Sequence, residues 1–222
     1  MSLTLYYHPL ASFCWKVLIA LYENDTAFTP RLIDLGDPAD QALMAGVWPV
    51  AKMPALIDQG RGETVAETSI IIDYLDQHHP GPRRMIPADP DAARQVRLWD
   101  RFFDLYVHDP MQRIVVSHLF MPAEAQPAIA AASRATLDTA YQTAEAHLQG
   151  RDWAAGEFGM ADCAAMPALF YSGILHPFEG FPALTGYAER LFERPSCARV
   201  LAEARPYFDM FPFVERMPER FR

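Results

Sequence analysis

Positive charge is scarce in this chain. Among its 222 residues there are 19 Lys and Arg against 28 Asp and Glu, which gives a formal net charge of -9. Proteins bind phosphate backbones mainly with basic surfaces, so this balance excludes nucleic acid as an expected partner. An anionic ligand would have to be held by local groups, such as a single lysine or the N-terminal end of a helix.

Cysteines and long apolar runs are also few. The three cysteines, at positions 14, 163 and 197, are too far apart for a disulfide framework or a metal-binding motif, which fits a reducing compartment. The longest apolar segment, residues 163–175, is too short to span a bilayer and predicts a buried helix. The first residues show no export signal. We therefore expect a cytoplasmic protein without membrane contact or bound metal.

The most informative stretch is residues 47–75. A Met-Pro step opens a short apolar run at 55–57, and Gln-Gly-Arg-Gly at 59–62 supplies a turn before a second short strand at 64–66. The segment Glu-Thr-Ser at 67–69 offers N-cap chemistry before an apolar-periodic helix. The pattern predicts a β-hairpin that leads into a helix N-terminus, where free N–H groups favour a carboxylate.

Two groups flank that helix end. The bond between Met53 and Pro54 is of the one type with an accessible cis form, and in that form Met53 could offer its main-chain N–H and C=O to an extended peptide. Lys52 adds a mobile positive charge beside it.

This order of features resembles the glutathione-binding half of the cytosolic glutathione transferase family. In that family the proline is cis and the residue before it pairs with the cysteinyl main chain of glutathione. The resemblance assigns Met53 and Pro54 to that contact, Glu67 and Thr68 to the γ-glutamyl end, and Lys52 to the glycyl carboxylate. Thr68 replaces the family's usual serine and keeps the hydroxyl.

The chain is predicted to form two domains. A strand at 3–7, a helix ending near residue 24 and a strand at 29–35 precede the hairpin and its helix, which is a thioredoxin-like order with a right-handed crossover. We expect this α/β domain over residues 1–79. A proline-rich linker at 80–90 should connect it to an all-helical domain over 91–222.

The helical domain should begin with a long helix whose apolar side repeats through the residues Val96, Trp99, Phe103 and Tyr106. The stripe Arg94, Arg97 and Arg101 beside them predicts a solvated or salt-bridged face, and the alternative is a homodimer cleft. The resemblance places a second-substrate pocket at five residues: Tyr106, His108, Met111, His118 and Phe120. Taken singly, each of them is more typical of ordinary packing or of the surface. Another helix is expected at 124–148, and the last 18 residues show no recognisable pattern.

A helix start is predicted near residue 159. Asp162 has the position that reaches back to the N-cap N–H, and Phe158 with Cys163 have the spacing of a hydrophobic staple. The family usually has Ser or Thr at the cap, and here it is Gly159. Only half of the capping box is therefore expected.

The catalytic group is the least determined part of the site. A free thiol has a pKa near 8.5, so glutathione transfer needs a donor that stabilises the sulfur anion. The resemblance places this group at Ala11, which has none, so the next residue, Ser12, is the candidate; alternatively Ser12 caps the first helix. Tyr6 and Tyr7 are expected in core packing, and the alternative is that one of them reaches the site. Cys14, at the second position of a lost Cys-x-x-Cys motif, is expected to be a buried spectator.

These observations favour a homodimeric glutathione transferase that conjugates glutathione to a small hydrophobic electrophile. Because Ala11 lacks a functional group, two alternatives remain: a non-catalytic glutathione-binding or scaffold protein of the same fold, and a glutathione-dependent isomerase or dehalogenase.

Overall fold

The N-terminal domain is a four-stranded mixed sheet with three helices. A computed structural model describes residues 2–222, and every structural statement below concerns these residues. The strand order is β2-β1-β3-β4, in which β1 runs parallel to β2 and antiparallel to β3, and β3 pairs antiparallel with β4. The strands are β1 (Leu3–Tyr7), β2 (Thr29–Leu32), β3 (Ala55–Asp58) and β4 (Glu63–Ala66). The predicted thioredoxin-like order is confirmed.

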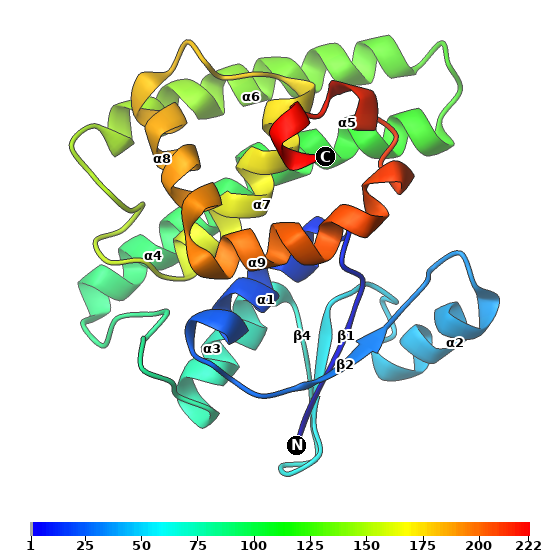
Figure 1. The fold of residues 1–222 in the computed structure, drawn as a ribbon, viewed down its shortest axis with the longest axis vertical. Helices are drawn as coiled ribbons and strands as arrows, with labels where there is room; N and C mark the ends of the chain where they lie inside the picture. The colour runs from blue at the N-terminus through cyan, green and yellow to red at the C-terminus, as the bar shows by residue number, and fades with distance from the viewer. Residues whose placement is uncertain (1) are drawn as a thin grey trace.

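Three helices cover this sheet: α1 (Ser12–Glu23), α2 (Pro38–Val47) and α3 (Thr68–His78). Side chains alternate along β1, so Leu3 and Leu5 join the main core with α1 and α3, whereas Tyr6 packs in a small cluster with Met44 of α2. In Figure 1 the sheet lies in the lower half, and α2 stands on the other side of it from α3. The sequence analysis missed α2, because Met44 is its only buried residue and its apolar pattern is weak.

The helical domain lies above the sheet in Figure 1. Its elements are α4 (Pro90–Phe102), the π-helix η1 (Phe103–His108), α5 (Asp109–Phe120), α6 (Gln126–Leu148), α7 (Met160–Leu175), α8 (Pro182–Glu193) and α9 (Pro195–Ala204). The central helix α7 is buried along almost its whole length, and α1 packs against α7 and α9. A single apolar core therefore extends across both domains.

The π-helix corrects one sequence prediction. Val96, Trp99 and Phe103 are buried together as predicted, but Tyr106 is 52% exposed. A π-helix has i to i+5 hydrogen bonds and therefore more residues per turn than the α-helix assumed in the prediction. Residues after Phe103 are rotated about the helix axis relative to that prediction, and Tyr106 no longer faces the core. Leu105 of the same π-helix is also exposed.

The predicted half capping box of α7 is confirmed. The side chain of Asp162 accepts from the Gly159 N–H at 2.9 Å, and Phe158 and Cys163 are both buried. The structure also explains the glycine: a Cβ at position 159 would lie 2.7 Å from the main-chain oxygen of Met85. Serine or threonine at this cap would collide with the interdomain segment, which packs here and is not a free linker.

The C-terminal residues fold onto the helical domain as three short 3-10 turns: η2 (Arg205–Met210), η3 (Val214–Arg216) and η4 (Glu219–Phe221). Phe208, Phe211 and Met217 are buried, and Phe221 packs edge-on against Phe170 of α7. The tail is therefore part of the core, although its sequence shows no helical period.

Candidate functional site

The strand register brings three predicted site segments to one edge of the sheet. Ala55 pairs with Ala66 across the hairpin, and it also pairs with Tyr6 of β1. The Met-Pro step directly precedes Ala55, residues 67 and 68 directly follow Ala66, and the loop 8–11 follows β1. Because paired residues lie side by side, these segments meet at the same edge.

The Met53–Pro54 peptide bond is cis, as the sequence analysis anticipated. Pro54 is buried and Met53 is half-buried against the cluster beneath α2. Within residues 2–222 neither the N–H nor the C=O of Met53 has a hydrogen-bond partner. These two groups are therefore free for an extended ligand.

Glu67 has an unusual conformation at the start of α3. It occupies the N-cap position with φ 67°, in the left-handed region that is costly for residues other than glycine. Its exposed side chain makes no capping bond, so the predicted N-cap chemistry is wrong in this detail. The first N–H groups of α3 are left without a side-chain acceptor, and the helix end remains open to an anion.

The chain between α2 and the cis bond carries two donors. Lys52 is exposed, and no partner for its ammonium group is found among the described residues. The indole Nε1 of Trp48 is buried and also lacks a partner there. The sequence analysis did not single out Trp48; the only signal for it was a tryptophan within the predicted glutathione-binding stretch.

Ser12 directly follows the loop 8–11, which is held by three hydrogen bonds to side chains. The carbonyl of Pro9 accepts from Trp15 Nε1, the carbonyl of Leu10 accepts from the hydroxyl of Tyr171 on α7, and the Leu10 N–H donates to His8 Nδ1. Both domains therefore fix the position from which α1 starts.

The Ser12 hydroxyl faces the helical domain. Its Oγ lies 2.7 Å from Nε2 of His108 and 3.4 Å from Nε2 of Gln112, and Ser12 is buried. Ala11 holds the N-cap position of α1 and Ser12 makes no capping bond, so the alternative role of Ser12 as a cap is wrong. Burial, with a smaller effect from the Lys16 charge, lowers the pKa of His108 to about 3.

One turn further along α1, Lys16 forms a buried ionic network. Its Nζ lies 2.5 Å from Asp100 Oδ1, 2.8 Å from Asp104 Oδ2 and 2.9 Å from Ser69 Oγ. Arg101 pairs with both carboxylates from the exposed side. Burial raises the pKa of Asp104 although Lys16 opposes this effect. The network joins α1, the start of α3, α4 and the π-helix η1.

Two further predictions concern residues near the first helix. Cys14 is fully buried, as predicted, and burial raises the pKa of its thiol to about 12. Tyr6 packs under α2, and Tyr7 lies at the edge of a separate recess. Neither tyrosine makes a hydrogen bond to the Ser12 loop.

The residues predicted for a second-substrate pocket are not brought together. His108 contacts Ser12, Met111 is in the core, His118 packs on Phe213, and Phe120 is 76% exposed. Tyr106 lines a groove of about 530 Å³ between the π-helix and α6. The face of α5 that continues from His108 instead carries Gln112, Val115 and Leu119, at spacings of three and four residues.

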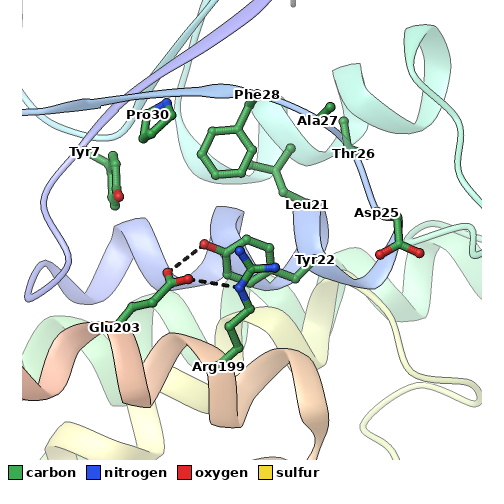
Figure 2. A pocket seen from close by; sticks show the side chains of 10 residues that line it. All are labelled: Tyr7, Leu21, Tyr22, Asp25, Thr26, Ala27, Phe28, Pro30, Arg199 and Glu203. Atoms are coloured by element: carbon green, nitrogen blue, oxygen red, sulfur yellow. Dashed lines mark hydrogen bonds and ion pairs between the residues drawn. The ribbon is translucent and has the colours of Figure 1, made fainter.

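A recess of about 390 Å³ lies between α1, β2 and α9, and it contains none of the predicted site residues. Figure 2 shows the hydroxyl of Tyr22 and the guanidinium of Arg199 both bonded to Glu203, with Phe28 above them. The Arg199 guanidinium lies 3.8 Å from the Tyr22 ring centre. These contacts join α1 to α9.

The fold and the site define a protein of the glutathione transferase type. Residues 5–83 match the family model described as "Glutathione S-transferase, N-terminal domain", and residues 107–195 match "Glutathione S-transferase, C-terminal domain". The chain is 31% identical to a probable glutathione S-transferase of Oryza sativa subsp. indica, over 93% of this chain and 92% of the relative.

A glutathione S-transferase of Pseudomonas putida is 27% identical over 92% of this chain and 93% of its own length. A solved glutathione S-transferase from Methylobacillus flagellatus with bound glutathione superposes with a TM-score of 0.80 at 25% identity, covering 90% of this chain and 98% of that one.

The chain belongs to the glutathione S-transferase family. The family, the fold class and the enzyme type predicted from the sequence are therefore confirmed. No helix within residues 2–222 is long and apolar enough to cross a membrane. In the same residues, no group of three or more His, Cys, Asp or Glu side chains is arranged to hold a metal ion.

Proposed function

We propose that this protein conjugates the thiolate of glutathione to a small hydrophobic electrophile. The observation that carries the proposal is the convergence of unpartnered polar groups at one edge of the sheet. They are the main chain of Met53, the ammonium of Lys52 and the start of α3, where Glu67 is the N-cap residue without a capping bond and Thr68 is the first helical residue. Unused hydrogen-bonding groups gathered on one edge are typical of a peptide-binding site.

Each of these groups suits one part of glutathione. Met53 can pair with the cysteinyl main chain as an edge strand would, beside the buried ring of Pro54. The N–H groups at the start of α3 suit the γ-glutamyl carboxylate, and the Glu67 carboxylate suits its ammonium group. Lys52 and the Trp48 indole N–H suit the glycyl carboxylate. The negative charge of the whole chain makes these local donors necessary.

Ser12 is the proposed thiol-activating residue. A hydroxyl that donates to sulfur favours the thiolate and lowers the thiol pKa toward neutrality. The thiol proton passes to solvent, the thiolate forms a bond to the electrophilic carbon, and the leaving group departs with its electron pair. The exposed apolar side chain of Leu119, on the α5 face that continues from His108, favours an apolar second substrate.

A homodimer is also proposed. Arg97 has no ionic partner among the described residues, and Leu98 is 55% exposed beside it on α4. Arg94, in contrast, pairs with Asp91 and Arg101 with Asp100 and Asp104 of the same chain, as a salt-bridged face would. A monomer in sedimentation equilibrium would contradict the dimer and leave the glutathione site unaffected.

The first test is a thermal-shift titration with reduced glutathione. Ligand at about 100 times its Kd should stabilise the native wild type by about 2.7 kcal/mol. Glu67→Ala should abolish the shift, and Glu124→Ala, which changes an exposed carboxylate on the loop before α6, should retain it. If the wild type shows no shift at millimolar glutathione, the proposal is wrong and the scaffold alternative is favoured.

The second test addresses chemistry. Ser12→Ala should lower kcat/KM for a model aryl halide by about 10-fold or more, because the thiolate loses its donor. Ser12→Thr, which keeps the hydroxyl, should retain more activity than Ser12→Ala. Unchanged turnover in Ser12→Ala would remove Ser12 from the mechanism without affecting the assignment of the binding site.

A further inference from the structure

The hydrogen bonds around Ser12 limit which group can accept its hydroxyl proton. A hydroxyl oxygen accepts two hydrogen bonds and donates one. Gln112 approaches Ser12 Oγ with an amide nitrogen, which donates. Within residues 2–222, the only group that could accept the Ser12 proton is therefore Nε2 of His108, and it can do so only if that nitrogen carries no proton.

The surroundings of His108 decide between its two neutral forms. The ring is fully buried, and its Nδ1 has no hydrogen-bond partner among residues 2–222. With the proton on Nδ1, the core would contain an orphaned N–H donor, which is rare in native proteins and costly. With the proton on Nε2, the unpartnered ring atom is only a lone pair, and the N–H points at Ser12 Oγ 2.7 Å away. The donor left without a protein acceptor is then the Ser12 hydroxyl, which is 6% exposed, whereas the His108 ring is 0% exposed.

The ring is also held firmly in place. Phe13 stacks on it with centroids 3.8 Å apart and planes 12° from parallel. His108 is the last residue of the π-helix, and Pro110 follows in the first turn of α5. The Lys16 ammonium lies one helical turn from Ser12, and its charge opposes a second proton on the ring. The imidazole therefore stays neutral and keeps one orientation.

We propose that His108 is a positioning residue: its neutral ring donates from Nε2 to Ser12 Oγ and so leaves the Ser12 proton to be donated to the glutathione sulfur. The inference rests on the proposed function for its ligand. With His108 and Gln112 filling the two acceptor positions of Oγ, the hydroxyl proton has no protein acceptor left. A sulfur anion then becomes the partner of this proton, which stays bonded to Ser12 Oγ, while the proton lost by the thiol passes to solvent.

The tautomer can be measured without glutathione. In protein labelled with 15N in its histidines, long-range 1H–15N correlation spectra distinguish Nε2–H from Nδ1–H. We expect the Nε2–H pattern for His108 near neutral pH. An Nδ1–H pattern would mean that Ser12 donates to His108, and it would overturn the proposal whether or not the protein binds glutathione.

Two variants then test the effect on sulfur. His108→Phe keeps a flat ring against Phe13 and removes the donor, and His108→Gln restores an amide N–H. Titration of the ultraviolet absorbance of the bound thiolate should show the thiol pKa raised by about one unit in His108→Phe, which is about 10-fold in thiolate population. Glutathione Kd should change less than about 3-fold, and His108→Gln should recover much of the loss.

The outcomes separate the two proposals. If Ser12→Ala raises the bound-thiol pKa and His108→Phe does not, His108 has no positioning role while the proposed function stands. In the Ser12→Ala background His108→Phe should have no further effect on that pKa, and an equal further rise would also contradict the inference. Equal losses in both His108 variants, together with lowered melting temperatures, would indicate a packing role and overturn it.

Discussion

Two sets of side-chain contacts at the domain interface lie one helical turn apart on α1 and differ in their charge. Lys16 of α1 meets Asp100 and Asp104 in a buried network where each charged side chain has an opposite partner. Ser12 meets His108 in a neutral pair with a spare proton and an unpartnered ring nitrogen. A network in which all charges are compensated holds the domains together, whereas a pair with unused capacity is available to a ligand.

The comparison extends to the two lysines, which are the only ones in the chain. Lys16 is fully buried and paired, and Lys52 is exposed at the predicted glutathione edge. Lys16 therefore stabilises the domain interface, whereas Lys52 is proposed to bind glutathione. Substitution at each position tests this division.

The largest effect is expected from Lys16→Met. Removing the ammonium leaves two buried carboxylates with the half-exposed Arg101 as their remaining cationic partner among residues 2–222, and losing one member of a buried ion pair typically costs about 3–5 kcal/mol. Urea denaturation at neutral pH measures the change. A loss below about 1 kcal/mol would show that the network is not a main source of interdomain stability.

The next effect concerns pH. Because the pKa of His108 is about 3 in the folded protein and near 6.5 when unfolded, the ring takes up a proton on unfolding. Its contribution to stability is complete above pH 6.5 and is lost as the pH falls toward 3. Between pH 8 and pH 5 the wild type should lose about 2 kcal/mol more than His108→Gln. Parallel losses in the two proteins would show that His108 titrates normally.

A smaller effect is expected at Glu67, where a substitution by glycine should relieve backbone strain and so favour stability. A residue other than glycine with φ 67° is strained, so Glu67→Gly should be more stable than Glu67→Ala by about 1 kcal/mol. Both variants should lose the thermal shift with glutathione. Chemical denaturation of the two proteins measures the difference, and a less stable glycine variant would show that the conformation carries no strain.

The smallest effect is expected from Lys52→Met, the matched partner of Lys16→Met. Its free energy of unfolding should stay within about 0.5 kcal/mol of wild type, because the side chain is exposed. Glutathione affinity measured by calorimetry should fall a few-fold and depend less on salt. An affinity equal to that of wild type would exclude Lys52 from the site.

Local patterns in the sequence were sufficient for much of the fold. The hairpin and α3 follow from a Met-Pro step, a Gly-containing turn and an apolar-periodic run, and all of these operate within about 25 residues. Asp162 and the half capping box could be located for the same reason, since a cap involves residues only three positions apart. The helix α2 escaped detection because it buries a single residue.

Other features depended on contacts between distant residues. Gly159 was unexplained until the packed interdomain segment showed that the Met85 carbonyl leaves no room for a Cβ. Tyr106 was placed on the wrong side because a π-helix changes the period without a sequence signal that could be identified. The C-terminal aromatic residues became interpretable only through the core that they cover.

The sequence by itself determined the family and the order of the two domains, and it supplied the proposal for the glutathione-side residues from Lys52 to Thr68, because these follow from short-range pattern and resemblance. Only the tertiary structure decided the surroundings of Ser12. Its partner His108 lies 96 positions away, and no periodicity links residues across two domains. The burial of His108 and the missing partner at its Nδ1 exist only after folding. On these two properties rests the proposal that the Ser12 hydroxyl donates its hydrogen bond to the glutathione sulfur.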